Sequence, residues 1–394
     1  MNTFYNRKTQ PSTPSSTFRG ILKAFGLAGL LLSAGTGFAQ DTNPGKIHIG
    51  FIYPLSTNGT HAPLDTNRLS IHLLAGVSSV ETGFTFAGFS NIIKNEAKGI
   101  QFAAFSNHIG KKAEGLQIAG FANTYGEGQG AAFAGFGNIS RGNVKGAQFA
   151  GFGNIAKAVD GAQFAGFFNK ATSVKGAQFA GFMNLTNKNV SCSQLAGFIN
   201  KAENVGGSQF AGFINIAKKV KGIQGAGFIN IADSSNYPIG IINLIKKGEK
   251  GISVTTDETT STMLSFRSGG KVLYGIIGIG YNFKNKDEVY AMEAGFGAHW
   301  FQGKSFRLNT ELTGMSVESF KAGEYFKSSL KVLPAFRIGK HFEIFGGPSF
   351  NFISTNTAEG RDLHKKFIHS WGNKWGNNLQ ALYIGYGGGI QFIL

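Results

Sequence analysis

The sequence predicts an all-β protein in which a β-solenoid of 15- to 16-residue repeats is joined to an outer-membrane-type antiparallel β-barrel. Three observations predict it. Gly and Phe supply 58 and 38 of the 394 residues while charged residues are only 15%, a short motif recurs through the middle of the chain, and long alternating segments follow it. Phe at this density argues against disorder. No apolar run in the body of the chain reaches the ~18 residues of a membrane-spanning helix.

Residues 1–39 have the pattern of a secretory signal peptide. Arg7, Lys8, Arg19 and Lys23 precede any acidic residue, an apolar stretch covers residues 24–33, and small residues end at Ala39. A basic start, a short apolar centre and a small-residue cleavage site are typical of export signals. We expect an exported chain that begins near Gln40 and lies in the outer membrane or at the surface of a Gram-negative cell.

Residues 40–83 are expected to hold N-terminal strands. The segments 47–54 and 69–80 alternate like two strands, and we expect them to close the sheet formed by the C-terminal block.

Residues 84–250 form a repeat domain built on the motif Ala-Gly-Phe-x-Asn, whose copies follow one another every 15 or 16 residues. Self-similarity at a short fixed period is the signature of a stacked repeat fold. The candidate structural residues are the Phe and Asn of each copy: Phe89, Phe105, Phe121, Phe136, Phe152, Phe167, Phe182, Phe198, Phe213 and Phe228, with Asn91, Asn107, Asn123, Asn138, Asn154, Asn169, Asn184, Asn200, Asn215 and Asn230.

A repeat of this length suits one coil of a β-solenoid, with coils stacked at ~4.8 Å. In the copy at 146–160, we expect Gly151 to turn a corner, and Phe149 and Phe152 to point inward as two aromatic columns. Asn154 should join a ladder of amides that bond from coil to coil. Lysines such as those at 218, 219 and 221 should line one outer edge.

The alternative treats each repeat as one strand of a large antiparallel barrel. Such a barrel alternates short turns with long loops and should therefore show a two-repeat period. The intervals between copies show none, which favours the solenoid.

Residues 251–394 contain long alternating segments that resemble transmembrane β-strands. Polar turns such as 284–287 and a longer loop at 356–378 separate them, and the chain stops on an apolar strand end. We predict aromatic girdles at the two membrane interfaces from Trp300, Tyr325, Trp371, Trp375, Tyr383 and Tyr386. The predicted strands are 271–283, 288–301, 306–317, 326–338, 342–354 and 380–394.

The export signal, the early Phe-Ile-Tyr-Pro-Leu segment at 51–55, the serial Gly-x-Gln-x-Ala-Gly-Phe-x-Asn repeats and the closing strand block resemble the bacterial surface-repeat-containing proteins. These are predicted outer-membrane proteins. The resemblance implies surface placement, and it brings no catalytic residue and no established activity.

No motif for catalysis, cofactor binding or metal binding is present, so we expect no enzyme and no cofactor. His364 and His369 are interpreted as a solvated loop, Asp257 with Glu258 as a polar turn, and the single cysteine, Cys192, as a small core residue.

The repeat segment 84–250 carries seventeen Lys or Arg against seven acidic residues, a surplus of ten positive charges. In an exported protein, anionic membrane lipid, lipopolysaccharide or a glycan is a more plausible partner than nucleic acid. The functional hypothesis is a structural or adhesive surface protein. The alternatives are a porin-like channel and a secreted solenoid that binds glycan.

Overall fold

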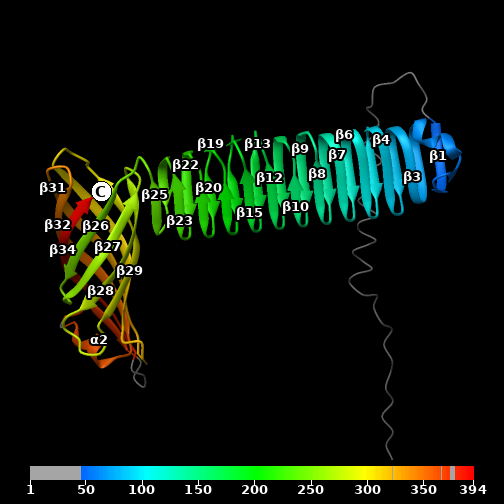
Figure 1. Cartoon of the computed structure of the whole chain (residues 1–394). Helices are drawn as coiled ribbons and strands as arrows, with labels where there is room; N and C mark the ends of the chain where they lie inside the picture. Colours follow the sequence, from blue (N-terminus) through cyan, green and yellow to red (C-terminus); the bar gives the residue numbers. More distant parts are fainter. Residues whose placement is uncertain (1–45, 322, 365, 373–377) are drawn as a thin grey trace, which may run out of the picture. The chain divides into compact units, whose positions relative to one another are not determined.

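The computed structural model describes residues 46–394 except 322, 365 and 373–377, so the predicted signal peptide lies outside the described residues. The predicted fold class is confirmed. A parallel β-solenoid of about 11 coils is followed by a closed antiparallel barrel of eight strands (Figure 1). The choice of the solenoid over a large barrel of repeat strands is also confirmed, because the repeat strands pair in parallel throughout.

The solenoid begins at β1 and ends at β25, with one 3-10 helix, η1 (Gly59–Leu64), near its start. Its strands are β1 (Lys46–Ile52), β2 (Leu55–Ser56), β3 (Thr66–Ala87), β4 (Ser90–Ala97), β5 (Ile100–Ala103), β6 (Ser106–Ala119), β7 (Ala122–Ala134), β8 (Gly137–Ser140), β9 (Asn143–Ala150), β10 (Gly153–Ile155), β11 (Ala158–Ala165), β12 (Phe168–Ala171), β13 (Ser173–Val174), β14 (Ala177–Ala180), β15 (Met183–Thr186), β16 (Asn189–Val190), β17 (Gln194–Ala196), β18 (Ile199–Lys201), β19 (Asn204–Val205), β20 (Gln209–Ala211), β21 (Ile214–Ile216), β22 (Lys219–Ala226), β23 (Ile229–Ala232), β24 (Ser234–Ile239) and β25 (Ile242–Ile245).

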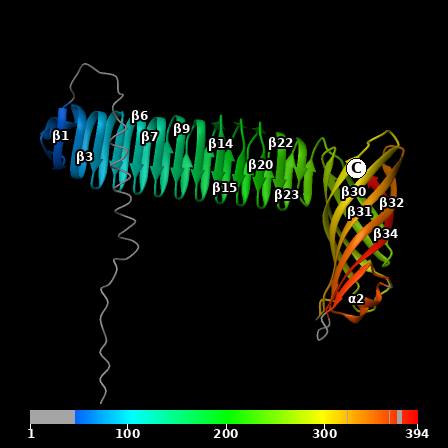
Figure 2. The ribbon, with the colours of Figure 1, turned by 180° about the vertical axis from the view of Figure 1, so that it is seen from behind.

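Each coil consists of two strand faces joined at two corners, and like residues stack on like residues along the solenoid. Val159 pairs with Val144 and Gln163 with Gln148 on one face, and Asn169 pairs with Asn154 on the other. The two faces can be followed in Figures 1 and 2, which view the coils from opposite sides. Between them lies a thin core of small side chains, with a valine in each coil from Val144 to Val220.

Two glycine columns are required by the close approach of stacked coils. A Cβ on Gly166 would lie 2.1 Å from the carbonyl oxygen of Gly151, at the corner that the sequence predicts. Gly161 has φ +142° as well, a conformation that side chains rarely adopt, and its Cβ would lie 2.0 Å from the oxygen of Gly146. The close spacing of the coils therefore explains the corner glycines, such as Gly166. The glycines before the Ala-Gln pair, such as Gly161, are explained by this spacing and also by their backbone conformation.

The prediction that the N-terminal strands close the C-terminal sheet is wrong. β1 pairs in parallel with β3, with Ile47 opposite Leu69, and β3 pairs in parallel with β4 and β5 of the repeat region. These strands are the first coils of the solenoid. They lack the repeat motif because their core is polar, as described below.

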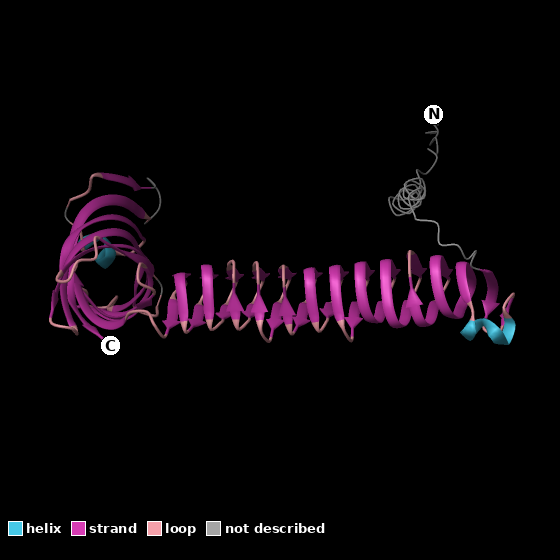
Figure 3. Ribbon diagram, turned by 90° about the horizontal axis from the view of Figure 1, so that it is seen from above, coloured by secondary structure: helices cyan, strands magenta, loops and turns pink. Residues whose placement is uncertain are grey.

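Four residues, 246–249, separate β25 from the barrel, which includes one short helix, α2 (Ala358–Asp362). Its strands are β26 (Lys250–Asp257), β27 (Ser261–Gly269), β28 (Leu273–Asn282), β29 (Tyr290–Trp300), β30 (Phe306–Glu318), β31 (Tyr325–Ile338), β32 (Phe342–Thr355) and β34 (Leu379–Ile393). A ninth strand, β33 (His369–Gly372), pairs with the first part of β34. Pairing of β26 with β34 closes the ring, which Figure 3 shows end on.

The six predicted C-terminal strands correspond to β28 through β32 and β34, within a few residues at each end. The sequence did not reveal β26 and β27, although the polar turn predicted at Asp257 and Glu258 does separate them. These two strands are needed to close the ring, because β34 pairs with β32 on one edge and with β26 on the other.

Along the barrel strands, apolar side chains point outward and polar ones inward. In β30, Leu312 is 59% exposed on the outside, while Glu311 and Thr313 on either side of it are 1% and 3% exposed. Leu330 and Ser329 of β31 repeat the pattern, at 50% and 2%. This alternation is the inverse of that in a soluble β-sheet, whose apolar face is buried.

The last coil and the barrel are bonded directly. The backbone N–H of Asn243 donates to Ser268 Oγ at 2.9 Å, and its side-chain amide donates to the Ser268 carbonyl oxygen at 3.2 Å. Among the described residues, no helix is long and apolar enough to span a membrane.

Candidate functional site: an aromatic edge and a filled barrel

The solenoid interior contains a continuous ladder of asparagine amides. Each of the ten predicted residues from Asn91 to Asn230 donates Nδ2–H to the Oδ1 of the next Asn at 2.8–3.0 Å, and Asn243 accepts the last of these bonds. Each of them is at most 1% exposed. The same Nδ2 groups also donate to backbone carbonyl oxygens near the corner, as Asn169 does to Phe179 at 2.8 Å. The amide ladder predicted from the sequence is therefore present.

A second ladder is formed by the glutamines of the repeat, which are 0–2% exposed. Gln163 donates to Gln148 and Gln178 donates to Gln163, both at 2.8 Å. Ala132 interrupts the column, and there Gln148 donates instead to the buried hydroxyl of Tyr125 at 2.8 Å. Because both kinds of amide are buried and bonded, the regular Gln and Asn side chains are not displayed to a ligand.

The two phenylalanine columns stack as predicted, but they do not point inward. The rings of Phe152 and Phe167 are 5.1 Å apart and nearly parallel, and those of Phe149 and Phe164 are 4.8 Å apart. In the column from Phe89 to Phe228, eight of the ten rings are 36–52% exposed, and Phe182 and Phe228 are partly exposed. The thin core has room for Val, Ala and extended amides and not for two rings per coil.

The Phe149 column borders a long, shallow groove of about 1060 Å³. Rings such as Phe149, Phe164 and Phe179 form its wall, and the Ala-Gly pairs that follow them in the sequence form its floor. The groove extends along the solenoid from the coil of Ala119 to that of Ile239. We call this groove and the Phe89–Phe228 column together the aromatic edge.

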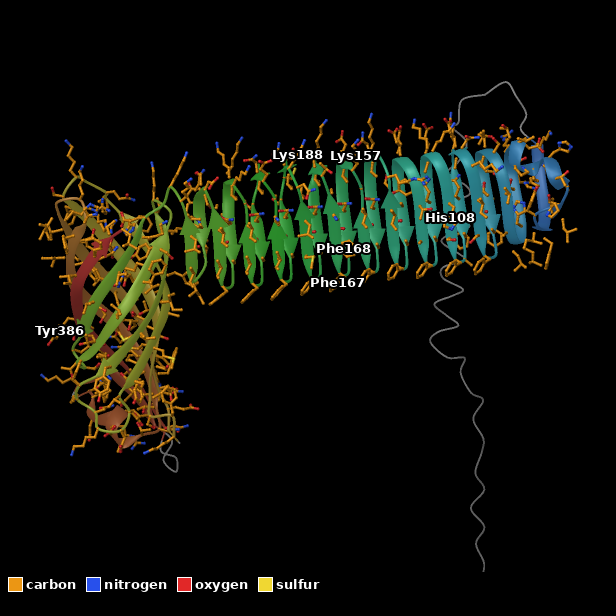
Figure 4. All side chains as sticks on the ribbon, viewed as in Figure 1. His108, Lys157, Phe167, Phe168, Lys188 and Tyr386 are labelled. Atoms are coloured by element: carbon orange, nitrogen blue, oxygen red, sulfur yellow. The ribbon has the colours of Figure 1, made fainter. Side chains whose placement is uncertain are left out.

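The corner opposite the aromatic edge is cationic. Figure 4 shows Phe167 on one edge of the coils and Lys157 and Lys188 on the other. Among the described residues, Lys218 pairs with Glu203 and Lys112 with Glu114. Exposed lysines of the repeats that make no ion pair with another described residue include Lys145, Lys157, Lys170, Lys188, Lys201, Lys219 and Lys221.

Cys192 is exposed, so its assignment to the core is wrong. It occupies the column of Gly161 and Gly176, where coils approach closely, and not a core column.

The first coils replace the apolar core with polar groups. Glu81 stands in register with Ala97 of the next coil and is 1% exposed. It accepts hydrogen bonds from Ser70 Oγ at 2.8 Å and Asn67 Nδ2 at 3.0 Å. Burial raises its pKa, and those hydrogen bonds oppose the rise. His72 is also buried, and its burial, with a smaller effect from His48, lowers its pKa to about 4.

The barrel interior holds oppositely charged side chains in contact. The Arg267 guanidinium makes two bonds to the Glu311 carboxylate, at 2.9 and 3.1 Å, and the hydroxyl of Tyr274 donates to Glu311 at 2.9 Å. Arg307 bonds to Glu343 at 2.8 and 2.9 Å. Lys327 forms an ion pair with Asp257, and Lys331 forms one with Glu293.

These groups fill the lumen. The cavity among Arg267, Glu293 and Glu311 has a volume of only about 40 Å³. An interior of eight strands is just wide enough for side chains to fill it. An open aqueous channel is thus absent from the described part of the barrel.

Of the residues predicted to form the aromatic girdles, three are exposed. Trp300, Trp371 and Tyr386 are 48%, 46% and 70% exposed. The prediction is wrong for Tyr325 and Tyr383, because their side chains are 1% and 4% exposed and face the interior. Trp375 lies outside the described residues.

The interpretation of His364 as a solvated loop residue is also wrong. Its side chain is 9% exposed and its Nε2 lies 2.7 Å from Tyr325 Oη, in hydrogen-bond contact. Burial, the largest cause, lowers the pKa of His364 to about 4. His369 is exposed, as expected. No group of three or more His, Cys, Asp or Glu placed to hold a metal ion occurs among the described residues.

Fold and site together define a class: a parallel β-solenoid with an exposed aromatic edge, continued by a closed eight-stranded barrel that is apolar outside and charged inside. Comparisons of the chain with protein-family models, with curated proteins and with solved structures find no match. The fold and the side chains on its surfaces are therefore the basis for a function.

Proposed function

We propose that this chain is an exported outer-membrane protein whose barrel anchors it in the bilayer and whose solenoid is a structural or adhesive element without catalysis. Membership of the bacterial surface-repeat-containing proteins is part of this proposal. The single observation that carries it is the outward apolar alternation of the barrel, as in Leu312 between buried Glu311 and Thr313. An apolar outer wall of this kind is stable in lipid and unfavourable in water.

The porin-like channel is the less favoured function. A conducting pore needs a polar lumen open to water, whereas the cavity of about 40 Å³ is surrounded by paired charges. A secreted glycan-binding solenoid is disfavoured too, because the repeated amides that would bind sugar hydroxyls are buried.

The adhesive part of the proposal rests on the cationic corner opposite the aromatic edge. Its lysines would attract the phosphate and carboxylate groups of lipopolysaccharide or of acidic glycans, and salt would weaken that attraction. Replacement of Lys157, Lys188, Lys201 and Lys219 by Gln should lower binding of the purified protein to lipopolysaccharide. Undiminished binding would contradict this role.

Membrane anchoring is tested by cell fractionation together with gel mobility before and after heating. We expect the mature chain in the outer-membrane fraction, with a folded form that migrates faster until it is heated. Leu312→Arg places a charge on the outer wall and should cost about 2–4 kcal/mol at the bilayer midplane. Thr313→Ser, one residue away on the inner wall, is the matched control and should keep the heat-sensitive form. A chain found wholly in the soluble periplasm would contradict the proposal.

Conductance distinguishes the two membrane functions. In planar bilayers we expect no steady single-channel current from the purified protein. Sustained currents would overturn the account of the filled lumen in favour of the porin-like channel.

A further inference from the structure

The aromatic edge is free of charge along the whole repeat domain. Ten five-residue segments, one per repeat, contain no Asp, Glu, Lys or Arg; they are 86–90, 102–106, 118–122, 133–137, 149–153, 164–168, 179–183, 195–199, 210–214 and 225–229. All the charged residues of the repeats stand outside these segments. Since the coils stack in register, these segments form one strip about 45 Å long at ~4.8 Å per coil.

The strip is apolar and accessible over that length. Eight rings of the Phe89–Phe228 column expose 36–52% of their surface even after stacking, and the groove beside them has walls of Phe and a floor of Ala and Gly. Monomeric soluble proteins rarely expose a continuous apolar surface this extensive, and one that does occur usually marks an interaction site.

The chemistry of the strip excludes a polar ligand. A sugar, peptide or nucleotide needs donors and acceptors at its binding surface. Here the regular amides point into the core and bond to one another, and the corner carbonyl oxygens accept hydrogen bonds from within the solenoid, as Phe167 O does from the N–H of Met183 at 2.9 Å. The partner must therefore be hydrocarbon.

The short connection between the solenoid and the barrel indicates which hydrocarbon surface the strip contacts. Only residues 246–249 separate β25 from β26, and Asn243 of the last coil is bonded to Ser268 of β27. Four residues span at most about 14 Å. A membrane that holds the barrel is thus held within reach of the solenoid, at the high effective concentration of an intramolecular partner.

From these observations we propose that the aromatic edge docks on the lipid bilayer, with its phenylalanine rings among the acyl chains and its lysine corner in water. This inference rests on the proposed anchoring of the barrel. It adds a second membrane contact, which makes the solenoid a membrane-lying element rather than a free projection. Burial of apolar side chains at the acyl boundary is the ordinary basis of interfacial binding.

The separation of charge supports this partner. Lys157 and Lys188 lie on the edge opposite Phe167, so none of these lysines has to be desolvated when the rings enter lipid. A second copy of the chain would also cover the rings. It would have to find its partner by diffusion, however, whereas the bilayer is already bound to the same molecule.

The experiment uses the full mature chain in liposomes, with a polarity-sensitive fluorophore on one introduced cysteine and exposed Cys192 replaced by serine. The three labelling sites are Phe167→Cys on the aromatic edge, Lys157→Cys on the opposite corner, and Leu330→Cys on the outer wall of the barrel. Phe213→Cys repeats the edge measurement in another coil, should Phe167→Cys fail to fold. Quenching is measured with nitroxide-labelled lipid and, separately, with aqueous iodide.

We expect lipid nitroxide to quench the label at residue 167 at least about threefold more strongly than the label at residue 157, because rings bound at an interface lie ~5–10 Å deep. Iodide should show the reverse order, and in liposomes of the same composition the label at residue 330 should be quenched by lipid.

Quenching by lipid at residue 330 but not at 167 or 213 would overturn the inference and leave the barrel anchor intact. Labels on the edge that are shielded from both lipid and iodide would overturn it in favour of a second copy. Absence of lipid quenching at every site would overturn both the inference and the proposed function.

Discussion

The solenoid and the barrel both bury polar side chains and expose apolar ones, yet they satisfy the buried groups in different ways. In the repeats of the solenoid most of the buried polar groups are neutral amides that bond to an identical amide one coil away, as Asn154 does to Asn169 at 2.9 Å. In the barrel they are charges that find opposite charges across the lumen, as Arg267 does in Glu311. The solenoid is thus stabilised by bonds between equivalent residues of successive coils, and the barrel by bonds between opposite charges across its closed lumen.

The largest expected difference between the two regions is their response to the loss of one unit. Deletion of residues 161–175 brings Gly146 beside Gly176 and joins coils with equivalent faces, so the chain should still fold. Deletion of β29 leaves seven strands and reverses the direction of every later one, so the barrel should not close. Heat-modifiable gel mobility measures both. A chain that tolerates the strand deletion but not the coil deletion would contradict the comparison.

A buried charge without its partner should have the next largest effect. Glu311→Leu leaves the Arg267 guanidinium, 5% exposed, without its carboxylate and should lower the free energy of unfolding by about 3–5 kcal/mol. The double variant Arg267→Leu with Glu311→Leu removes both charges and should recover most of that loss. Urea titration in detergent checks the pair. Equal losses in the single and double variants would mean that the charge pair is not what stabilises the barrel.

Within the solenoid, the interior amide should matter more than the exposed ring. Asn169→Ala breaks the ladder on both sides of one coil and should cost about 3 kcal/mol, because buried groups are left unpaired. Phe167→Ala removes a ring that is already 38% exposed and should cost about 1–2 kcal/mol. Urea denaturation followed by circular dichroism measures both.

Asn187→Ala is the matched control for Asn169→Ala, since Asn187 is exposed and makes no side-chain hydrogen bond to another described residue. It should change stability by less than about 0.5 kcal/mol. A larger loss for Phe167→Ala than for Asn169→Ala would restore the expectation that the rings form the core.

The smallest expected effect is on the pH dependence of the first coils. The pKa of His72 is about 4 in the folded chain and near 6.5 when unfolded, so the unfolded chain binds more protons between these values. Stability is therefore full above pH 6.5 and is lost as pH falls toward 4, by at most about 2 kcal/mol at pH 5. The raised pKa of Glu81 acts in the opposite direction and reduces this loss.

Amide hydrogen exchange in β1 and β3 between pH 7 and pH 5 measures this loss. We expect His72→Gln to flatten the profile, because it removes the proton that the unfolded chain gains. An unchanged profile would show that His72 is not the group responsible.

Much of the fold could be predicted because the repeats are regular. The register of the Asn ladder follows from the spacing of Asn91 to Asn230, and the ends of β30 from alternation and polar turns. The direction of the phenylalanines could not be predicted in this way. An alternating pattern separates Phe149 from Gln148 without saying which of them is inside, and the usual preference of Phe for the core gave the wrong answer.

The first two predicted strands were assigned to the wrong sheet, and the first barrel strands were missed, for a related reason. In β1 and β3 the repeat motif is replaced by a polar core of His48, His72 and Glu81, so no similarity to the later coils remains. In β26 and β27 the alternation is carried by Ser and Thr on the inner wall, such as Ser253 and Ser265, which gives little contrast in hydropathy. The pairing of β26 with β34 joins strands from the two ends of the barrel sequence, and local sequence patterns do not predict such long-range pairing.

The claim that the barrel's apolar wall faces lipid is tested most directly by labelling neighbouring residues on opposite sides of that wall. Cysteines at Leu312 and Leu330 on the outside, and at Thr313 and Ser329 on the inside, are labelled one at a time in the Cys192→Ser chain in liposomes. We predict strong quenching by lipid nitroxide at residues 312 and 330 and little at 313 and 329. Equal quenching at all four residues, or iodide quenching at 312 and 330, would contradict a membrane-embedded barrel.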